Sequence, residues 1–285
     1  MPRFKPDTVV RGGVTIWLER TAGAGPPCLL VGGAGAISAF WSDALCAALA
    51  AAGHPVIRYD HRDAGRSSFV DVTRAPYGLS DLVDDALALL DHAGAPAAHF
   101  VGHSMGGFIA QLAAIHHPER VLSLTSLSSH TASPDVPPPA ERTWEVMLAN
   151  QPCGDVERDL AGYQRVWRYL NGDVPFDSVA AEAYTRELYA RNPATLPATN
   201  HVAIQAGMED RTRQLRQLAL PALVIHGERD PLVPLVAGRM TAEAIPGARL
   251  VVVPDAGHMF FNAGVWAALT AEVAAFLGRV STDGR

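Results

Sequence analysis

Short, continuously apolar runs recur along this chain and alternate with stretches of helical spacing. The six runs cover residues 28–31, 56–59, 98–101, 121–124, 222–225 and 250–253. Strands that are apolar at every position, rather than at every second one, are typical of a parallel sheet buried on both faces. Between the runs, apolar residues recur with helical spacing over residues 38–52, 80–93 and 106–117. The alternation predicts an α/β fold with a doubly wound sheet, and Ser80 is a predicted helix N-cap.

Two segments depart from this alternation. Residues 8–19 read as a hairpin, because the Gly12-Gly13 pair separates two apolar-rich runs. Near residue 130 the strand pattern stops at a proline-rich stretch and resumes only at Ala222. Helical segments are expected there over residues 140–150, 156–170 and 177–190. We therefore predict a helical cap, residues 131–214, inserted into a core made of residues 1–130 and 215–285.

Composition and charge limit the functions that this chain can have. The chain has 285 residues, 48% of them hydrophobic, which suits one large core. Its net charge of −6, without a run of basic residues, disfavours nucleic acid and acidic membrane surfaces as partners. The first residues carry no apolar leader, and no stretch is expected to reach transmembrane length. Three cysteines are too few for a disulfide framework, and Cys28 and Cys46 are expected to be buried thiols. These features predict a cytoplasmic protein and leave its oligomeric state open.

A candidate nucleophile follows the third of these runs. Gly102-x-Ser104-x-Gly106 ends an apolar strand and opens a helix. A sharp strand-to-helix turn lifts a serine hydroxyl off the sheet, and glycines flank it because Cβ atoms would collide with neighbouring backbone. The helix N-terminus then presents N–H groups beside the hydroxyl. The pattern predicts Ser104 as a nucleophile, although Gly-rich turns containing serine also occur without any catalytic role.

The partners of such a serine are expected later in the chain, an acid first and then a histidine, each just after a strand. The run 222–225 leads into Asp230, and the run 250–253 leads into His258. We predict His258 as the base and Asp230 as the acid that orients it. Glu228 and Asp255 are alternatives to Asp230, although Asp255 also suits a turn.

An oxyanion hole is predicted at two backbone N–H groups. The first run of the sheet ends in a glycine-rich loop that contains Ala34, and Met105 follows the serine. We assign the two donors to Ala34 and Met105. A glycine loop can also cradle phosphate, but this one lacks the Lys-Ser/Thr of a P-loop and the G-x-G-x-x-G spacing of dinucleotide sites.

Aromatic residues near these loops and in the predicted cap suit an apolar substrate pocket. The predicted lining consists of Phe40, Trp144, Trp167 and Phe260, although aromatic residues on helices are more often part of the packing. No Cys/His cluster has the spacing of zinc ligands. We therefore expect no metal and no cofactor, and a small-molecule ester as the partner.

These motifs resemble the α/β-hydrolase family from about residue 8 to 280. Many cap-bearing members carry Asp-x-Arg-Gly-x-Gly-x-Ser where this chain has Asp60, Arg62, Gly65 and Ser67, with Asp63 in place of the usual first glycine. The Arg-Asp variant, followed by Pro76-Tyr-Gly78, is similar to the aclacinomycin methylesterase group, which also shares the absence of a His at position 32.

The resemblance implies a mostly parallel eight-stranded sheet with helices on both faces and a helical cap. It also implies a triad of Ser104, Asp230 and His258, with oxyanion donors at Ala34 and Met105. Members of the methylesterase group cleave the methyl ester of anthracycline polyketides, so the expected reaction is hydrolysis of a carboxylic ester through an acyl-enzyme. A lactonase, thioesterase or carbon–carbon bond hydrolase with the same triad is an alternative. A non-catalytic ligand-binding protein of this fold is another.

Overall fold

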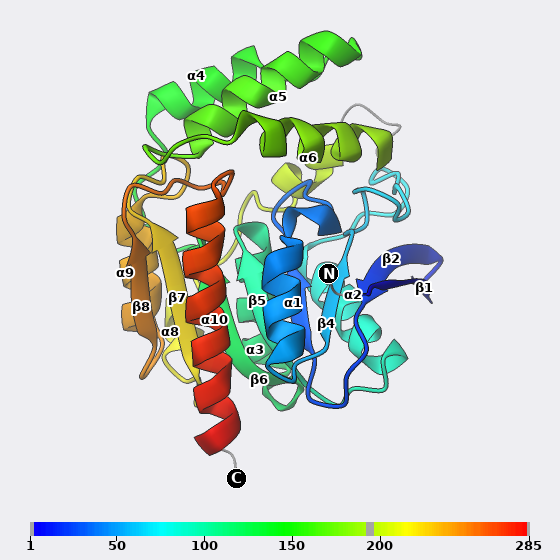
Figure 1. The fold of residues 1–285 in the computed structure, drawn as a ribbon, viewed down its shortest axis with the longest axis vertical. Coiled ribbons are helices and arrows are strands. Elements are labelled where there is room, and N and C mark those ends of the chain that lie inside the picture. The colour runs from blue at the N-terminus through cyan, green and yellow to red at the C-terminus, as the bar shows by residue number, and fades with distance from the viewer. Residues whose placement is uncertain (1–2, 192–196, 284–285) are drawn as a thin grey trace.

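A computed structural model describes residues 3–191 and 197–283, and the side chains of 197–199 and 281–283 lie outside that description. Within these residues, eight strands form one sheet with helices on both faces (Figure 1). The strand order is β1-β2-β4-β3-β5-β6-β7-β8. The strands are β1 (Lys5–Arg11), β2 (Val14–Arg20), β3 (Cys28–Val31), β4 (Val56–Tyr59), β5 (Ala98–His103), β6 (Val121–Leu127), β7 (Ala222–Gly227) and β8 (Arg249–Val253). The predicted mostly parallel eight-stranded sheet is confirmed.

The six strands from β4 to β8 in this order pair in parallel, and β1 and β2 are antiparallel additions at one edge. Gly12 and Gly13 join β1 to β2 with φ angles of 56° and 82°. Positive φ at both central residues of a two-residue turn matches the right-handed twist of a hairpin. The predicted hairpin is therefore present, and its strands extend to Lys5 and Arg20.

Helices cover the two faces of the sheet as separate layers. On one face α1 (Asp43–Ala51) packs against α10 (Ala263–Asp283), and on the other α2 (Leu79–His92) packs against α3 (Met105–His116). The helix α9 (Leu235–Ala244) lies along β7 and β8. Each layer encloses its own cluster of buried apolar side chains against the sheet. Cys28 and Cys46 are buried in the first cluster, as expected, and burial raises the pKa of Cys46 to about 12.

The chain between β6 and β7 forms helices and no strand within the described residues. These inserted helices are α4 (Glu141–Ala149), α5 (Val156–Leu170), α6 (Ser178–Arg191), α7 (Pro197–Ala203) and α8 (Thr212–Leu215). Figure 1 shows α4, α5 and α6 lying across the end of the sheet at which the parallel strands finish. The division into core and cap at residues 131 and 214 stays a prediction. Its outer ends, residues 1 and 285, and the segment 192–196 lie outside the described residues.

Three local expectations were wrong. The stretch 38–52 is not one helix, because the chain turns after the 3-10 turn Ser38–Phe40 and Ser42 caps α1, its hydroxyl accepting from Leu45 N at 3.2 Å. Ser80 is not the N-cap of α2, since the helix begins at Leu79 and the Asp81 carboxylate accepts from Gly78 N at 2.9 Å. The third expectation was that no stretch reaches transmembrane length. It was wrong, because α10 is long and apolar enough to cross a membrane by length and composition alone. In the structure it packs along α1, β6 and β7, as core helices of that composition do.

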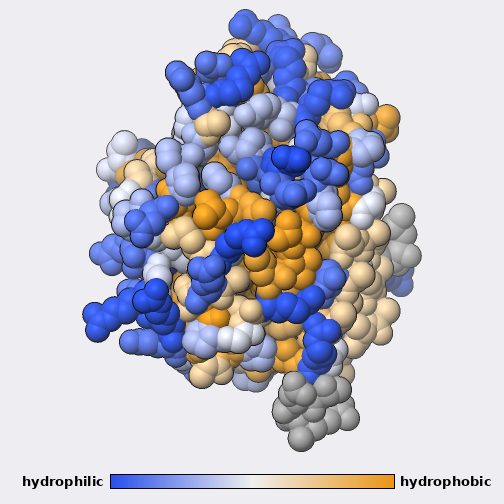
Figure 2. All heavy atoms as spheres, turned by 90° about the vertical axis from the view of Figure 1, so that its left-hand side faces the viewer, coloured by the Kyte–Doolittle hydropathy of each residue, from blue (hydrophilic) through white to orange (hydrophobic). Residues whose placement is uncertain are grey.

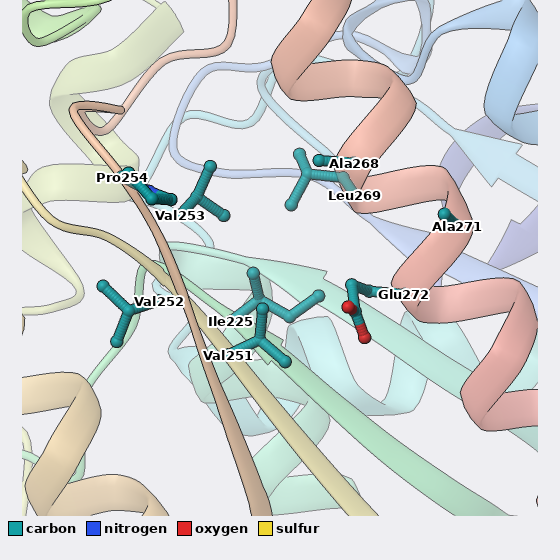
Figure 3. Close-up of a pocket in the computed structure, with 9 residues that line it drawn as sticks. All are labelled: Ile225, Val251, Val252, Val253, Pro254, Ala268, Leu269, Ala271 and Glu272. Atoms are coloured by element: carbon teal, nitrogen blue, oxygen red, sulfur yellow. The ribbon is translucent and has the colours of Figure 1, made fainter.

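The sheet ends at β8, and apolar side chains gather on that side of the molecule. Figure 2 shows this face, with an apolar area in its middle and a mostly hydrophilic surface above it, where Figure 1 places α4 and α5. A cavity of about 230 Å³ lies there between β8 and α10, lined by side chains of β7, β8 and α10 (Figure 3). Its lining includes none of the residues predicted for catalysis, so we interpret it as a packing groove at the sheet edge.

A buried ion pair ties α2 to the loop after β4. The Arg62 guanidinium donates twice to the Asp85 carboxylate, with both distances at 2.7 Å, and the two side chains are 6% and 1% exposed. A buried charge that loses its partner is costly, because neither water nor another ion replaces the lost contact.

Asp85→Ala is therefore expected to lower the free energy of unfolding by about 3–5 kcal/mol, measured by urea denaturation. The matched control is Asp84→Ala, since Asp84 pairs with Arg11 at the surface with 43% of its side chain exposed. That change is expected to cost about 0–1 kcal/mol. Equal costs for the two variants would contradict the assignment.

Candidate active site

Ser104 is the single residue between β5 and α3, and its backbone conformation is strained. Its φ of 53° and ψ of −118° lie outside the regions that a side chain other than glycine normally adopts. The backbone around it is fully bonded. Ser104 N donates to Leu127 O at 2.9 Å, and Ser104 O accepts from the Ser129 hydroxyl at 2.9 Å. The hydroxyl is thus carried by a sharp, well-supported turn at the carboxyl edge of the sheet.

The two flanking glycines are required by close backbone contacts. A Cβ at Gly102 would lie 2.1 Å from Gly106 O, and a Cβ at Gly106 would lie 2.0 Å from Val31 O. No side chain fits at either position unless the backbone moves. Glycine therefore allows α3 to cross β3 closely enough to place Ser104 at this edge.

Asp230 and His258, predicted as acid and base, are brought together by the loops after β7 and β8. His258 Nδ1 lies 2.8 Å from Asp230 Oδ2, and both side chains are buried. The other carboxylate oxygen, Oδ1, accepts from Leu232 N at 2.9 Å and Val233 N at 2.8 Å. Burial alone would raise the pKa of Asp230. The facing His258 and these hydrogen bonds outweigh it, so the pKa lies below its ordinary value and the carboxylate is ionised at neutral pH.

The alternatives for the acid lie elsewhere. Glu228 is exposed, and its carboxylate accepts from Asp255 N at 3.2 Å. Asp255 occupies a turn with a φ of 56°. His226 directs Nε2 to Val233 O at 2.8 Å and lies 3.6 Å from the Asp230 carboxylate. Of these three acids, only Asp230 is within hydrogen-bonding distance of His258.

His258 lies beside the serine turn through its contact with His103, the residue before Ser104. His103 Nε2 donates to His258 O at 2.9 Å, and the centroids of the two rings are 4.9 Å apart. Burial lowers the pKa of His103 to about 3, so its ring is neutral. His103 therefore connects the serine turn to the histidine loop.

The predicted oxyanion loop, residues 32–35 after β3, passes close to the serine turn. A Cβ at Gly33 would lie 3.3 Å from Ser104 Cβ and 3.1 Å from His103 Nδ1. Ala34 follows Gly33, and Met105 is the first residue of α3. The structure thus brings both segments assigned to the oxyanion hole to Ser104.

The Asp60–Ser67 motif supports the oxyanion loop through hydrogen bonds. Asp60 Oδ1 accepts from Ser38 N at 2.7 Å, just past the oxyanion loop, and Asp60 Oδ2 accepts from Arg66 N at 2.9 Å. The Ser67 hydroxyl donates to Asp60 O at 2.6 Å and accepts from Trp17 N at 2.9 Å. Asp60 and Ser67, two of the residues that match the family motif, therefore form a buried hydrogen-bond network next to the oxyanion loop.

The sequence model of the alpha/beta hydrolase fold matches residues 26–263 of this chain. The chain belongs to the α/β-hydrolase fold family.

Two relatives and one solved structure refine this placement. Rhodomycin D methylesterase DauP from Streptomyces sp. (strain C5) is 38% identical, over 88% of this chain and 91% of that enzyme. Rhodomycin D methylesterase DnrP from Streptomyces peucetius is also 38% identical, over 86% of this chain and 89% of that enzyme. A hydrolase from Pseudomonas aeruginosa PA01 superimposes with a TM-score of 0.74 at 29% identity, covering 96% of this chain and 98% of that one. The resemblance to the methylesterase branch of the α/β-hydrolase family is confirmed.

Two of the four predicted pocket residues lie next to the serine turn of this hydrolase. Phe40 stacks on His103 with ring centroids 4.7 Å apart, and Phe260 meets the same ring at 5.3 Å. Trp167 belongs to a second aromatic group, formed by the inserted helices and the loop after β8, and donates Nε1 to the Thr185 hydroxyl at 2.9 Å. That group also contains Tyr163, Tyr184 and Phe261.

Trp144 lies apart from both groups. It is 46% exposed on α4, and within the described residues no aromatic contact joins it to Phe40, Trp167 or Phe260. The structure thus places Phe40 and Phe260 beside the serine turn, Trp167 in an aromatic group that meets Phe40 through Tyr184, and Trp144 exposed on α4.

Two contacts from the inserted helices were not foreseen from the sequence. Leu170 O, at the end of α5, accepts from His258 N at 2.6 Å. His201, on α7, accepts from Gly35 N in the oxyanion loop at 2.9 Å. No local sequence signal marks either residue, because both contacts join positions far apart in the chain. Within the described residues, no group of three or more His, Cys, Asp or Glu side chains is arranged to hold a metal ion.

Gly106→Ala is expected to lower the free energy of unfolding by about 1–3 kcal/mol or more, because the new methyl group overlaps Val31 O. Gly278→Ala provides the matched control. Gly278 lies exposed in α10, where a Cβ would have nothing within 4 Å, so alanine is expected to stabilise the helix by about 0.5–1 kcal/mol. Urea denaturation measures both. Opposite signs are expected, and a Gly106→Ala variant as stable as the wild type would refute the close crossing.

Proposed function

We propose that the carboxylic ester hydrolysed by this chain is the methyl ester of a bulky, largely apolar acid, and that Ser104, His258 and Asp230 perform the reaction. The observation that carries this proposal is the buried 2.8 Å contact between His258 and Asp230, next to a serine in a strained turn. Two relatives 38% identical to this chain, each named a rhodomycin D methylesterase, support the choice of ester.

In the first half of the proposed reaction, His258 takes the proton of the Ser104 hydroxyl as Oγ attacks the ester carbonyl. Asp230 accepts from His258 Nδ1 and stabilises the imidazolium that forms. The N–H groups of Ala34 and Met105 donate to the oxyanion, where each donor is worth about 10²–10³ in rate. The C–O bond then breaks, and the histidine proton leaves on methanol.

In the second half, water replaces the alcohol. His258 takes a proton from the water as its oxygen attacks the acyl-enzyme carbonyl, and the same N–H groups hold the second oxyanion. The bond to Ser104 Oγ breaks, the serine recovers its proton from His258, and the carboxylic acid leaves. No cofactor enters the balance.

Aromatic side chains around the serine turn support an apolar acyl side. Phe40 and Phe260 border His103, while Trp167 and Phe261 lie 5.8 Å apart between the inserted helices and the loop after β8. Such rings favour flat, apolar acyl groups. We infer that the inserted helices, the predicted cap 131–214, form the acyl side of the site.

We also place this reaction in the cytoplasm. The three cysteines are free, with Cys28 and Cys46 buried, as suits a reducing compartment. A small-molecule ester is the proposed partner.

The triad is tested with p-nitrophenyl butyrate. Ser104→Ala is expected to show no turnover and no labelling by a fluorophosphonate. Asp230→Asn is expected to lower kcat by about 10³–10⁴ while the protein stays folded, because the imidazole loses its orienting partner. Glu228→Gln is the matched control and is expected to keep normal activity. Near-normal activity in Asp230→Asn, with loss in Glu228→Gln, would reassign the orienting role.

The acyl side of the substrate is tested by comparing two methyl esters. Methyl 2-naphthylacetate is expected to have at least about tenfold higher kcat/KM than methyl propionate, because the extra apolar area is buried against aromatic rings. Trp167→Ala is expected to reduce that preference, and Trp144→Ala, on the outer surface, is its control. Faster hydrolysis of a matched thioester or lactone would favour those alternative activities instead.

A further inference from the structure

The oxyanion loop is held at both ends by buried histidines that lie outside the proposed triad. At its start, His61 Nε2 donates to Gly32 O at 3.0 Å. Near its end, Gly35 N donates to His201 Nδ1 at 2.9 Å. Ala34, whose N–H is the proposed oxyanion donor, lies between these two points. The direction of that N–H therefore depends on both contacts.

The contacts of His201 define its tautomer. Because Nδ1 accepts from a backbone N–H, the ring proton is on Nε2, which donates to Arg62 O at 2.7 Å. The side chain is fully buried. Burial lowers the pKa of His201 below its ordinary value, which keeps the ring neutral and able to accept. One ring thus joins the oxyanion loop to the loop after β4.

A neighbouring contact fixes α7, the helix that carries His201. Asn200 Nδ2 donates to Asp63 Oδ2 at 2.9 Å, and the Tyr77 hydroxyl donates to the same oxygen. Asp63 has a φ of 62°, a conformation that favours glycine. The carboxylate thus gives α7 an attachment that glycine does not provide.

We propose that His201 is a positioning residue for the oxyanion hole, holding Gly35 from the inserted helix α7 so that the Ala34 N–H points at the developing oxyanion. Asp63 and Asn200 hold α7 in register for this contact. The proposal rests on the proposed ester hydrolysis at Ser104. It adds that the inserted helices take part in transition-state stabilisation as well as in covering the acyl group.

Two matched substitutions separate the two hydrogen bonds of the ring. His201→Asn places a side-chain oxygen near the position of Nδ1, so Gly35 keeps its acceptor while Arg62 O loses its donor. His201→Gln places an amide nitrogen near the position of Nε2, so Arg62 O keeps its donor while Gly35 loses its acceptor. Each variant loses one hydrogen bond, which matches the pair for stability, and thermal unfolding verifies the match.

His201→Gln is expected to lower kcat about 10- to 100-fold, with KM little changed, because the oxyanion donor is misplaced. His201→Asn is expected to stay within about threefold of wild type, because the loop keeps its hydrogen bond. The second readout is inhibition by a trifluoromethyl ketone, which forms a tetrahedral oxyanion on the serine. Its Ki is expected to rise with His201→Gln in proportion to the loss in kcat/KM, and to change little with His201→Asn.

Equal losses in both variants, or wild-type kcat in both, would overturn the positioning role. Failure of the proposed function has a different signature, since wild type itself would then neither turn over ester nor react with a fluorophosphonate.

Asp63→Gly tests the attachment of α7, because glycine accepts the local backbone conformation and only the carboxylate is lost. It is expected to lower kcat in the same direction as His201→Gln. Combined, the two changes are expected to cost less than the product of their separate effects, since both act through Gly35. Fully multiplicative effects would show that Asp63 acts independently of His201.

Discussion

The close crossing of α3 over β3 is the constraint on which the rest of the site depends. Ser104 keeps a φ of 53°, a conformation that costs roughly 1–3 kcal/mol, only because the surrounding structure leaves no alternative. β6 accepts its N–H at Leu127, and the Gly106 backbone rests against Val31 O. The turn is thereby built before any substrate arrives. In the proposed reaction, a serine held in this turn needs no backbone rearrangement before it attacks, and preorganisation of this kind makes the electrostatic stabilisation of an oxyanion effective.

The loop after β8, which carries His258, is also held by short backbone hydrogen bonds. Its partners lie at the end of α5. Leu170 O, the last residue of α5, accepts from His258 N at 2.6 Å and from Met259 N at 3.0 Å, and Gly257 N donates to Asn171 O at 3.0 Å. The proposed base is therefore supported by the inserted helices as much as by the sheet. A displacement of α5 would move the imidazole, so the segment over the site contributes to its geometry as well as to its cover.

The strands, most helices and the loop positions of Ser104, Asp230 and His258 were predictable, because hydrophobic period and turn glycines are local properties of a sequence. Contacts between distant segments have no such signature. Nothing near His201 indicates that it meets Gly35, and nothing near Leu170 indicates that it meets His258. Trp144 and Trp167 illustrate the same limit. Both are tryptophans on predicted helices, and only packing leaves the first 46% exposed while the second donates to Thr185 inside the aromatic group.

The histidines around the proposed site share one electrostatic property. His61, His103 and His201 each donate Nε2–H to a backbone carbonyl, and burial lowers the pKa of His61 and His103 to about 3 and that of His201 below its ordinary value. They are therefore neutral at neutral pH. In the proposed reaction His258 becomes positively charged, and Asp230 is the group that compensates this charge. A second cation beside it would oppose that step through a low-dielectric interior, where charges are poorly screened. Burial thus allows the site to use imidazoles as rigid hydrogen-bond donors without adding the positive charge that would raise the barrier.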